Sequence, residues 1–182
     1  MSDPLSDARG GVVPSSADPP SGRWPTAQPW VSLVLRLALA GILLWAGGAK
    51  IGDLPASVRA VRAFELLPEA LARPVGYGLP ILEIVVGLLL LAGLLTRYAA
   101  VLSALLMAGF VVGIASAWAR GLSIDCGCFG GGGQIEPDLT EYPLEIVRDL
   151  AILAGALVVA RWPRSRFALD TSLGLVAPSA QA

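Results

Sequence analysis

The sequence predicts an all-α membrane protein: a four-transmembrane-helix bundle with a short interfacial helix in the first outer loop. Composition is the first observation behind this fold class. Hydrophobic residues make up 55% of the 182-residue chain and charged residues only 15%, whereas a soluble domain has about 25% charged residues. The second observation is that the apolar residues form long runs, and a run of about 20 residues crosses a bilayer as a helix. We therefore expect the lipid bilayer to surround most of the chain.

The four expected spans differ in strength. The second and third are apolar on every face, which disfavours the alternative of a soluble bundle of buried helices. The fourth is the weakest, because Arg148 and Asp149 must lie within it or at its edge. Aromatic residues near most of the predicted ends are typical of membrane interfaces. The expected spans are residues 31–51, 74–95, 98–118 and 144–162.

The domain organisation follows from these spans. Residues 1–29 are rich in Pro, Ser, Gly and Asp without an apolar period, so we expect a disordered tail. Residues 30–162 form the transmembrane domain, and residues 163–182 form a second tail. Between the first two spans, residues 53–73 are amphipathic at helical spacing, which predicts the interfacial helix or a plain surface helix.

The orientation rests on arginines. Four spans place both termini on one side of the membrane, and Arg161, Arg164 and Arg166 follow the last span closely. Positive residues favour the cytoplasmic side. We expect the cytoplasmic membrane as location, with both termini in the cytoplasm and the loop between the third and fourth spans outside, where disulfides persist.

Several function classes are disfavoured. The chain has no histidine, which removes Ser-His and Cys-His catalysis. Its net charge is −1 with no long basic run, so nucleic-acid binding has no electrostatic basis. A zinc or iron–sulfur site needs about four ligands, and two thiols from one chain are too few without a dimer. No metal is therefore expected.

Both cysteines lie in the stretch "IDCGCFGGGGQ", at Cys126 and Cys128. Four roles are open for the two cysteines: a structural disulfide, two inert thiols, a metal site in a dimer, or a redox-active pair. We favour the redox-active pair. We expect the glycines to leave both sulfurs flexible and accessible to a partner. The acidic residues of the loop favour the neutral thiols, while Arg120 could stabilise a thiolate and makes Cys126 the candidate for the attacking thiol.

Four of the charged residues within the predicted spans are candidates for a buried pair, because a charge in the membrane is costly and usually has a partner. From the rise per residue, Glu83 pairs best with Arg148. Arg148 and Asp149 are adjacent, so they do not face each other on a helix. Arg36 lies nearer the inner face. Such a pair either sets helix register or forms a proton or electron-acceptor site beneath the thiols.

The membrane region resembles the MauE branch of the DoxX-like membrane proteins. The order and spacing of four pieces carry this resemblance more specifically than any one piece alone. The pieces are "RLALAGILLWAGGAKI", "LPILEIVVGLLLLAGLLTRYAA", "IDCGCFGG" and "VRDLAIL".

The resemblance implies a four-helix bundle in the cytoplasmic membrane that is associated with methylamine utilisation, where the family takes part in maturing a disulfide-rich enzyme subunit. The family's paired cysteines fall on Cys126 and Cys128. Its membrane charges fall on Arg36, Glu83, Arg148 and Asp149. We expect a membrane thiol–disulfide oxidoreductase with a protein redox partner, and a quinone is a possible electron carrier. The alternatives are a non-catalytic assembly factor that holds a redox partner and, less favoured, a small-solute transporter.

Overall fold

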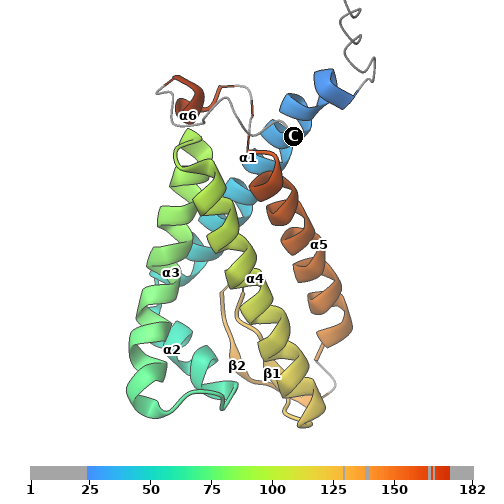
Figure 1. The fold of residues 1–182 in the computed structure, drawn as a ribbon. Helices are drawn as coiled ribbons and strands as arrows, with labels where there is room; N and C mark the ends of the chain where they lie inside the picture. Colours follow the sequence, from blue (N-terminus) through green and yellow to red (C-terminus); the bar gives the residue numbers. More distant parts are fainter. Residues whose placement is uncertain (1–23, 129, 138–139, 164, 166, 173–182) are drawn as a thin grey trace, which may run out of the picture.

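The computed structural model describes residues 24–128, 130–137, 140–163, 165 and 167–172. Four long helices lie side by side, and the short elements lie at the two ends of this bundle (Figure 1). The long helices are α1 (Trp24–Ile51), α3 (Glu69–Ala92), α4 (Thr96–Ala119) and α5 (Tyr142–Arg161). Helix α2 (Leu54–Ala63), β1 (Ile124–Asp125) and β2 (Gly133–Gln134) lie at one end, and α6 (Leu169–Ser172) lies at the other (Figure 1).

Three of these helices, α1, α3 and α4, are long and apolar enough to cross a membrane. The expectation of a mostly helical membrane protein is therefore confirmed. Helix α5 occupies the predicted fourth span, but its first half carries Glu145, Arg148 and Asp149, which lower its hydropathy. A four-span count stays a prediction.

The core of the bundle is a layer of aliphatic side chains contributed by all four long helices. Leu43, Leu90 and Ala156 are almost completely buried in it. The opposite faces of the same helices expose large apolar side chains such as Trp45, Leu105 and Val112. An outward apolar face without a protein partner is what lipid contact requires.

Helices α1 and α3 approach each other closely at Gly47. A Cβ atom placed there would lie 2.7 Å from Ile84 Cγ1 and 2.8 Å from the Pro80 carbonyl oxygen. Small residues allow membrane helices this distance of approach. Gly47 therefore places the last turn of α1 directly against the middle of α3.

The predicted interfacial helix corresponds to α2. Asp53 caps its first turn by accepting a hydrogen bond from the Ala56 N–H at 3.0 Å, as N-cap residues do. Its buried face, which includes Val58 and Ala60, packs on α3 and beneath the strand β2. Helix α2 thus forms one wall of the end of the bundle where the cysteines lie.

The predicted tails differ in part from the structure. Residues 24–29 belong to helix α1, with Pro25 in its first turn, where a helix needs no N–H donor; residues 1–23 lie outside the described residues. In the predicted C-terminal tail, α6 is packed on the bundle. Its Asp170 is buried and accepts hydrogen bonds from the Leu95 and Thr96 N–H groups at 2.7 Å each. This carboxylate satisfies backbone donors at the start of α4, which otherwise have no helical partners.

Candidate functional site

The two cysteines form a compact turn directly after β1. Both are free thiols. Asp125 accepts a hydrogen bond from the Gly127 N–H at 3.0 Å, and Cys126 Sγ accepts one from the Cys128 N–H at 3.3 Å. Gly127 has a φ of +65°, a conformation that favours glycine. The turn therefore holds both sulfurs on the same side of the loop, close to each other.

Both thiols are buried, so the prediction that they are accessible is wrong for this structure. Cys126 is 6% exposed and Cys128 is 5% exposed. They belong to a second apolar cluster at this end of the bundle. Its other buried members are Ile114, Ala117, Ile124 and Tyr142. A partner can reach the sulfurs only after the loop that covers them moves.

The glycine run after Cys128 lies on helix α2. Gly130, Gly131, Gly132 and Gly133 all have φ between +76° and +125°, a range that residues with a side chain rarely adopt. A Cβ atom at Gly132 would lie only 2.5 Å from the Ala60 Cβ of α2 and 2.9 Å from the Gly127 Cα. The glycines thus let the chain pack directly between α2 and the cysteine turn, instead of forming a loose loop.

Tyr142 anchors the start of the loop. Its hydroxyl donates a hydrogen bond to the Leu122 carbonyl at 2.6 Å and accepts one from the Ile124 N–H at 2.8 Å. The sequence suggested only an interfacial aromatic residue here. The two hydrogen bonds join the first residue of α5 to the strand that precedes the cysteines, so α5 and the thiols keep a set distance.

Arg148 on α5 reaches the cysteine turn. Its Nη2 lies 3.8 Å from Cys126 Sγ, and its Nε donates to Asp149 Oδ1 at 2.9 Å. The expectation that these sequence neighbours do not interact is wrong, because the long guanidinium side chain folds back along the helix. The proposed pairing of Arg148 with Glu83 is wrong as well.

Arg120, the cation expected at the thiols, lies elsewhere. Its guanidinium donates to the Phe64 carbonyl and lies 4.0 Å from the Glu65 carboxylate. Arg148 is the cation beside the thiols instead. Its guanidinium and the Cys128 N–H both donate to Cys126 Sγ, and such donors stabilise a negative charge on sulfur. A hydrogen bond with Cys126, together with burial, raises the pKa of the Cys128 thiol well above its usual range. The two cysteines therefore differ: Cys126 Sγ accepts from two donors, whereas the Cys128 thiol is held in its protonated form.

Glu83 pairs with Lys50, a residue that the sequence did not single out. Lys50 Nζ donates to both carboxylate oxygens of Glu83, at 2.6 and 2.9 Å, and both side chains are at most 5% exposed. The ammonium also lies 5.5 Å from the centre of the Phe110 ring. Lys50 lies one residue before the end of the predicted first span, where a charge can also face solvent. The close approach of α1 and α3 at Gly47 is what brings it opposite Glu83.

The four predicted membrane charges do not form a single site. Asp149 is 1% exposed and interacts electrostatically with the Lys50 ammonium as well as with Arg148. The Lys50–Glu83 and Arg148–Asp149 ion pairs therefore interact electrostatically through Lys50 and Asp149. These four residues form a charge network that the partly exposed Arg148 connects to Cys126. Arg36 lies at the opposite end of the bundle, where its Nη2 donates to the Phe167 carbonyl at 3.5 Å and its charge faces Asp170.

Two further carboxylates flank Cys126. Donor atoms of Asp125, Cys126 and Glu145 lie within 4.8 Å of one another, a grouping that could contact a cation. Three donors are fewer than a structural zinc site uses. The positive Arg148 guanidinium beside the sulfur also opposes a second cation. The geometry suits thiol chemistry better than metal binding.

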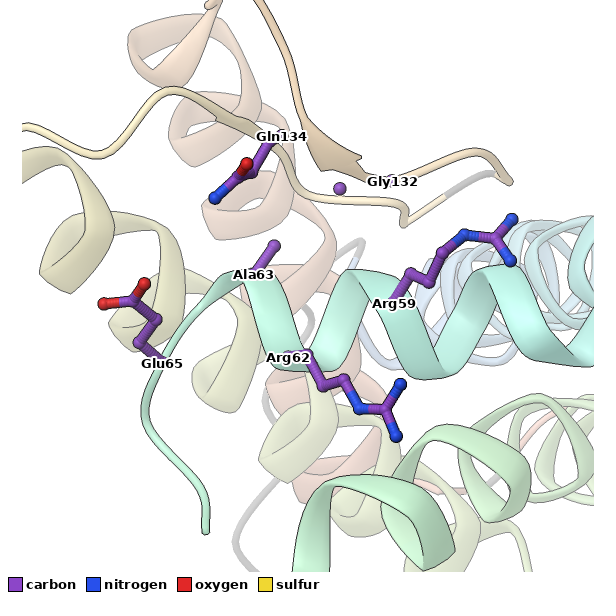
Figure 2. Close-up of a pocket in the computed structure, with 7 residues that line it drawn as sticks. Arg59, Arg62, Ala63, Glu65, Gly132 and Gln134 are labelled. Carbon is purple, nitrogen blue, oxygen red and sulfur yellow. The ribbon is translucent and has the colours of Figure 1, made fainter. Parts of the chain in front are cut away.

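Two cavities adjoin the glycine run. The larger, of about 430 Å³, lies between α2 and β2 and is lined by Arg59, Arg62, Glu65 and Gln134 among others (Figure 2). The smaller, of about 180 Å³, lies between the end of α1, α2 and residues 130–132, and Lys50 is part of its wall. Because Lys50 lines the smaller cavity, space large enough for water lies next to the charge network.

The fold and the site define a helical membrane protein that carries a buried pair of thiols at one end of its bundle. The sequence matches the family described as "Methylamine utilisation protein MauE" over residues 28–161. It is 33% identical over 137 residues to the methylamine utilization protein MauE of Paracoccus denitrificans. This match covers 73% of this chain and 70% of that protein. The chain therefore belongs to the MauE family. No solved structure matches it.

Proposed function

We propose that this protein carries out thiol–disulfide exchange through Cys126 and Cys128 with a partner protein at the outer face of the cytoplasmic membrane. The observation that carries the proposal is the asymmetry of the pair. Arg148 and the Cys128 N–H support a thiolate at Cys126, while Cys128 holds its proton. An attacking thiol and a resolving thiol need this difference.

The exchange balances without another reactant. The Cys126 thiolate attacks one sulfur of a partner disulfide, forms a mixed disulfide and releases the second partner sulfur as a thiolate, which takes up a proton. Cys128 then attacks Cys126 Sγ and releases the partner dithiol, leaving a Cys126–Cys128 disulfide. Run in reverse, the same steps oxidise the partner. A quinone in the membrane is the electron carrier that we propose for restoring the pair.

Family membership supports a setting for this chemistry. The relative in Paracoccus denitrificans is named for methylamine utilisation, and we propose that this chain matures disulfides of a protein in the same process. The membrane arrangement that we propose has four spans, with α5 as the fourth, both termini in the cytoplasm and the cysteine loop outside. The charges of α5 favour this, because they face the buried network and the thiols instead of lipid.

A non-catalytic scaffold for a redox partner is the second candidate. The burial of both thiols favours it, because a buried thiol is usually inert. A scaffold needs the bundle and the loop but not the sulfur atoms. A small-solute transporter remains the less favoured candidate, supported only by the buried charges.

Single cysteine substitutions separate these functions. Membranes from cells that carry Cys126→Ser or Cys128→Ser are quenched with acid and run on a non-reducing gel. We expect Cys128→Ser to trap a heavier, reductant-sensitive species, because the mixed disulfide at Cys126 can no longer be resolved. Cys126→Ser should trap none. If neither variant traps a species and both support oxidation of the partner as the wild type does, the scaffold replaces the exchange mechanism.

A further inference from the structure

We propose that Asp149 is the proton acceptor of the thiol pair, and that it takes the proton which Cys128 must release when the pair closes to a disulfide. This inference rests on the proposed thiol–disulfide exchange and adds to it a residue and a proton route.

The closing step creates the need for a base. Once Cys126 is joined to a partner sulfur, the Cys128 thiol must lose its proton before its sulfur can attack Cys126 Sγ and expel the partner thiolate. The Cys128 side chain is only 5% exposed and lies in the apolar cluster around the turn. Solvent hydroxide has poor access to it, so a protein group has to accept this proton.

Asp149 has the geometry of that group. Its Oδ1 accepts from Arg148 Nε, the same guanidinium that contacts Cys126. Its Oδ2 is buried and has no hydrogen-bond partner among the described residues. A buried carboxylate oxygen without a donor is costly, and protonation at Oδ2 removes part of that cost. Arg148 and the Cys128 N–H both contact Cys126 Sγ, so one guanidinium separates the Asp149 carboxylate from the turn that holds both thiols. The charge of Asp149 also acts on the Cys128 thiol.

Glu145 is the rival acid. It also has a buried oxygen, Oε2, without a partner in the described part of the chain. Its carboxylate, however, lies within 4.8 Å of the sulfur of Cys126, the attacking thiol, and of the Asp125 carboxylate. Asp125 is engaged by the Gly127 N–H. Asp149 is therefore the carboxylate that best serves the resolving thiol.

The remaining charged groups around Asp149 give the proton a way out. Lys50 of α1 faces Asp149 and is bound to Glu83 of α3, while α4 has no titratable residue between Ala99 and Ala119. Lys50 also lines the cavity of about 180 Å³, which has room for several waters at about 30 Å³ each. The network thus connects the thiols to solvent-sized space beneath the glycine run.

Closure of the pair can be timed on the purified full-length chain in detergent, without a natural partner. The reduced protein is mixed with 4,4′-dithiodipyridine, which releases one thiopyridone on attack at the first thiol and a second on closure. We expect Asp149→Asn to slow the second release on the order of 100-fold at neutral pH. Rising pH should restore the rate because hydroxide replaces the base, and Asp149→Glu should restore it at neutral pH.

Two variants serve as controls. Glu145→Gln tests the rival acid, and Asp170→Asn removes a buried carboxylate at the opposite end of the bundle. Asp170→Asn should leave the pH profile of the second release unchanged. Glu145→Gln removes a carboxylate beside Cys126, so it should change the first release more than the second. If Glu145→Gln reproduces the effect or Asp149→Asn leaves the profile unchanged, the assignment to Asp149 is overturned.

If the first release is too slow to separate the two steps, the reduction potential of the pair decides. It is measured from pH 5 to 9 in glutathione buffers. If Asp149 takes up a proton together with the thiol pair, the plot of reduction potential against pH has an inflection. Asp149→Asn should abolish this inflection, and Asp149→Glu should keep it at a different pH. An inflection that persists in Asp149→Asn overturns the proposal. A pair that cannot form its disulfide in any buffer instead overturns the proposed function.

Discussion

Lys50 and Glu83 join α1 to α3 through two hydrogen bonds of 2.6 and 2.9 Å, buried between the helices. Their separation in sequence is 33 residues, and no helix periodicity connects them. The contact exists because Gly47 lets the two helices approach closely. It joins the base of the cysteine site to the apolar core, and the first prediction concerns it.

Glu83→Ala should destabilise the protein strongly. Removal of one partner of a buried ion pair leaves an uncompensated charge, which costs about 3–5 kcal/mol. We expect a lower melting temperature in detergent and poorer accumulation in the membrane. Adding Lys50→Met to Glu83→Ala should recover much of the loss, whereas adding Arg148→Met should not. Rescue by the Arg148 change instead would mean that the Lys50 pairing is wrong.

Gly132→Ala should loosen the packing of the cysteine turn on α2. The new Cβ would meet Ala60 at 2.5 Å, and φ at this position is +89°. Backbone strain of this kind costs about 1–3 kcal/mol, so we expect the thiols to react with a small neutral alkylating reagent on the order of tenfold faster. Gly121→Ala is the control, since it has φ +68° but open space around it.

Ala60→Gly tests the same contact from the other side. Combined with Gly132→Ala, it removes the atom that the new methyl group meets, so the reaction rate should return part of the way to that of the wild type. An unchanged rate in Gly132→Ala would show that the glycine run does not restrict access to the thiols.

The Cys128 thiol should make the reduced protein less stable at alkaline pH. Its folded-state pKa is raised, so the folded state keeps the proton while the unfolded chain loses it above the ordinary cysteine value of about 8.5. The unfolded state then binds fewer protons, and stability falls as pH rises past that value. At pH 10 the loss approaches about 2 kcal/mol. Melting temperatures at pH 7 and 10 should show a smaller drop in Cys128→Ser; an equal drop would contradict the prediction.

The orientation can be tested with new cysteines at the two ends of the bundle. Gln134 is exposed next to the thiols, and Phe167 is 83% exposed beside α6. In a chain that lacks both native cysteines, Gln134→Cys should react with a membrane-impermeant maleimide in intact cells. Phe167→Cys should react only after the cells are broken. The reverse pattern would invert the proposed topology.

The sequence alone determined the class of protein. Long apolar runs can avoid water only in lipid or in a large core, so composition and run length were enough to predict a helical membrane protein. The position of α2 was also readable, because amphipathic spacing is a local property. The cysteines stood out as candidates for chemistry for the same reason: both lie in one short motif.

Only the tertiary structure decided which groups meet. Glu83 takes Lys50 as partner and Arg148 takes Asp149 and Cys126, because helix approach and rotation are set by packing at residues such as Gly47. For these pairings the sequence allowed only the depth of each charged residue in the membrane to be estimated. Depth does not specify which faces of two helices touch. The glycine run illustrates the same limit. Glycine permits both a loose loop and a close contact, and the surface of α2 beneath it made the contact.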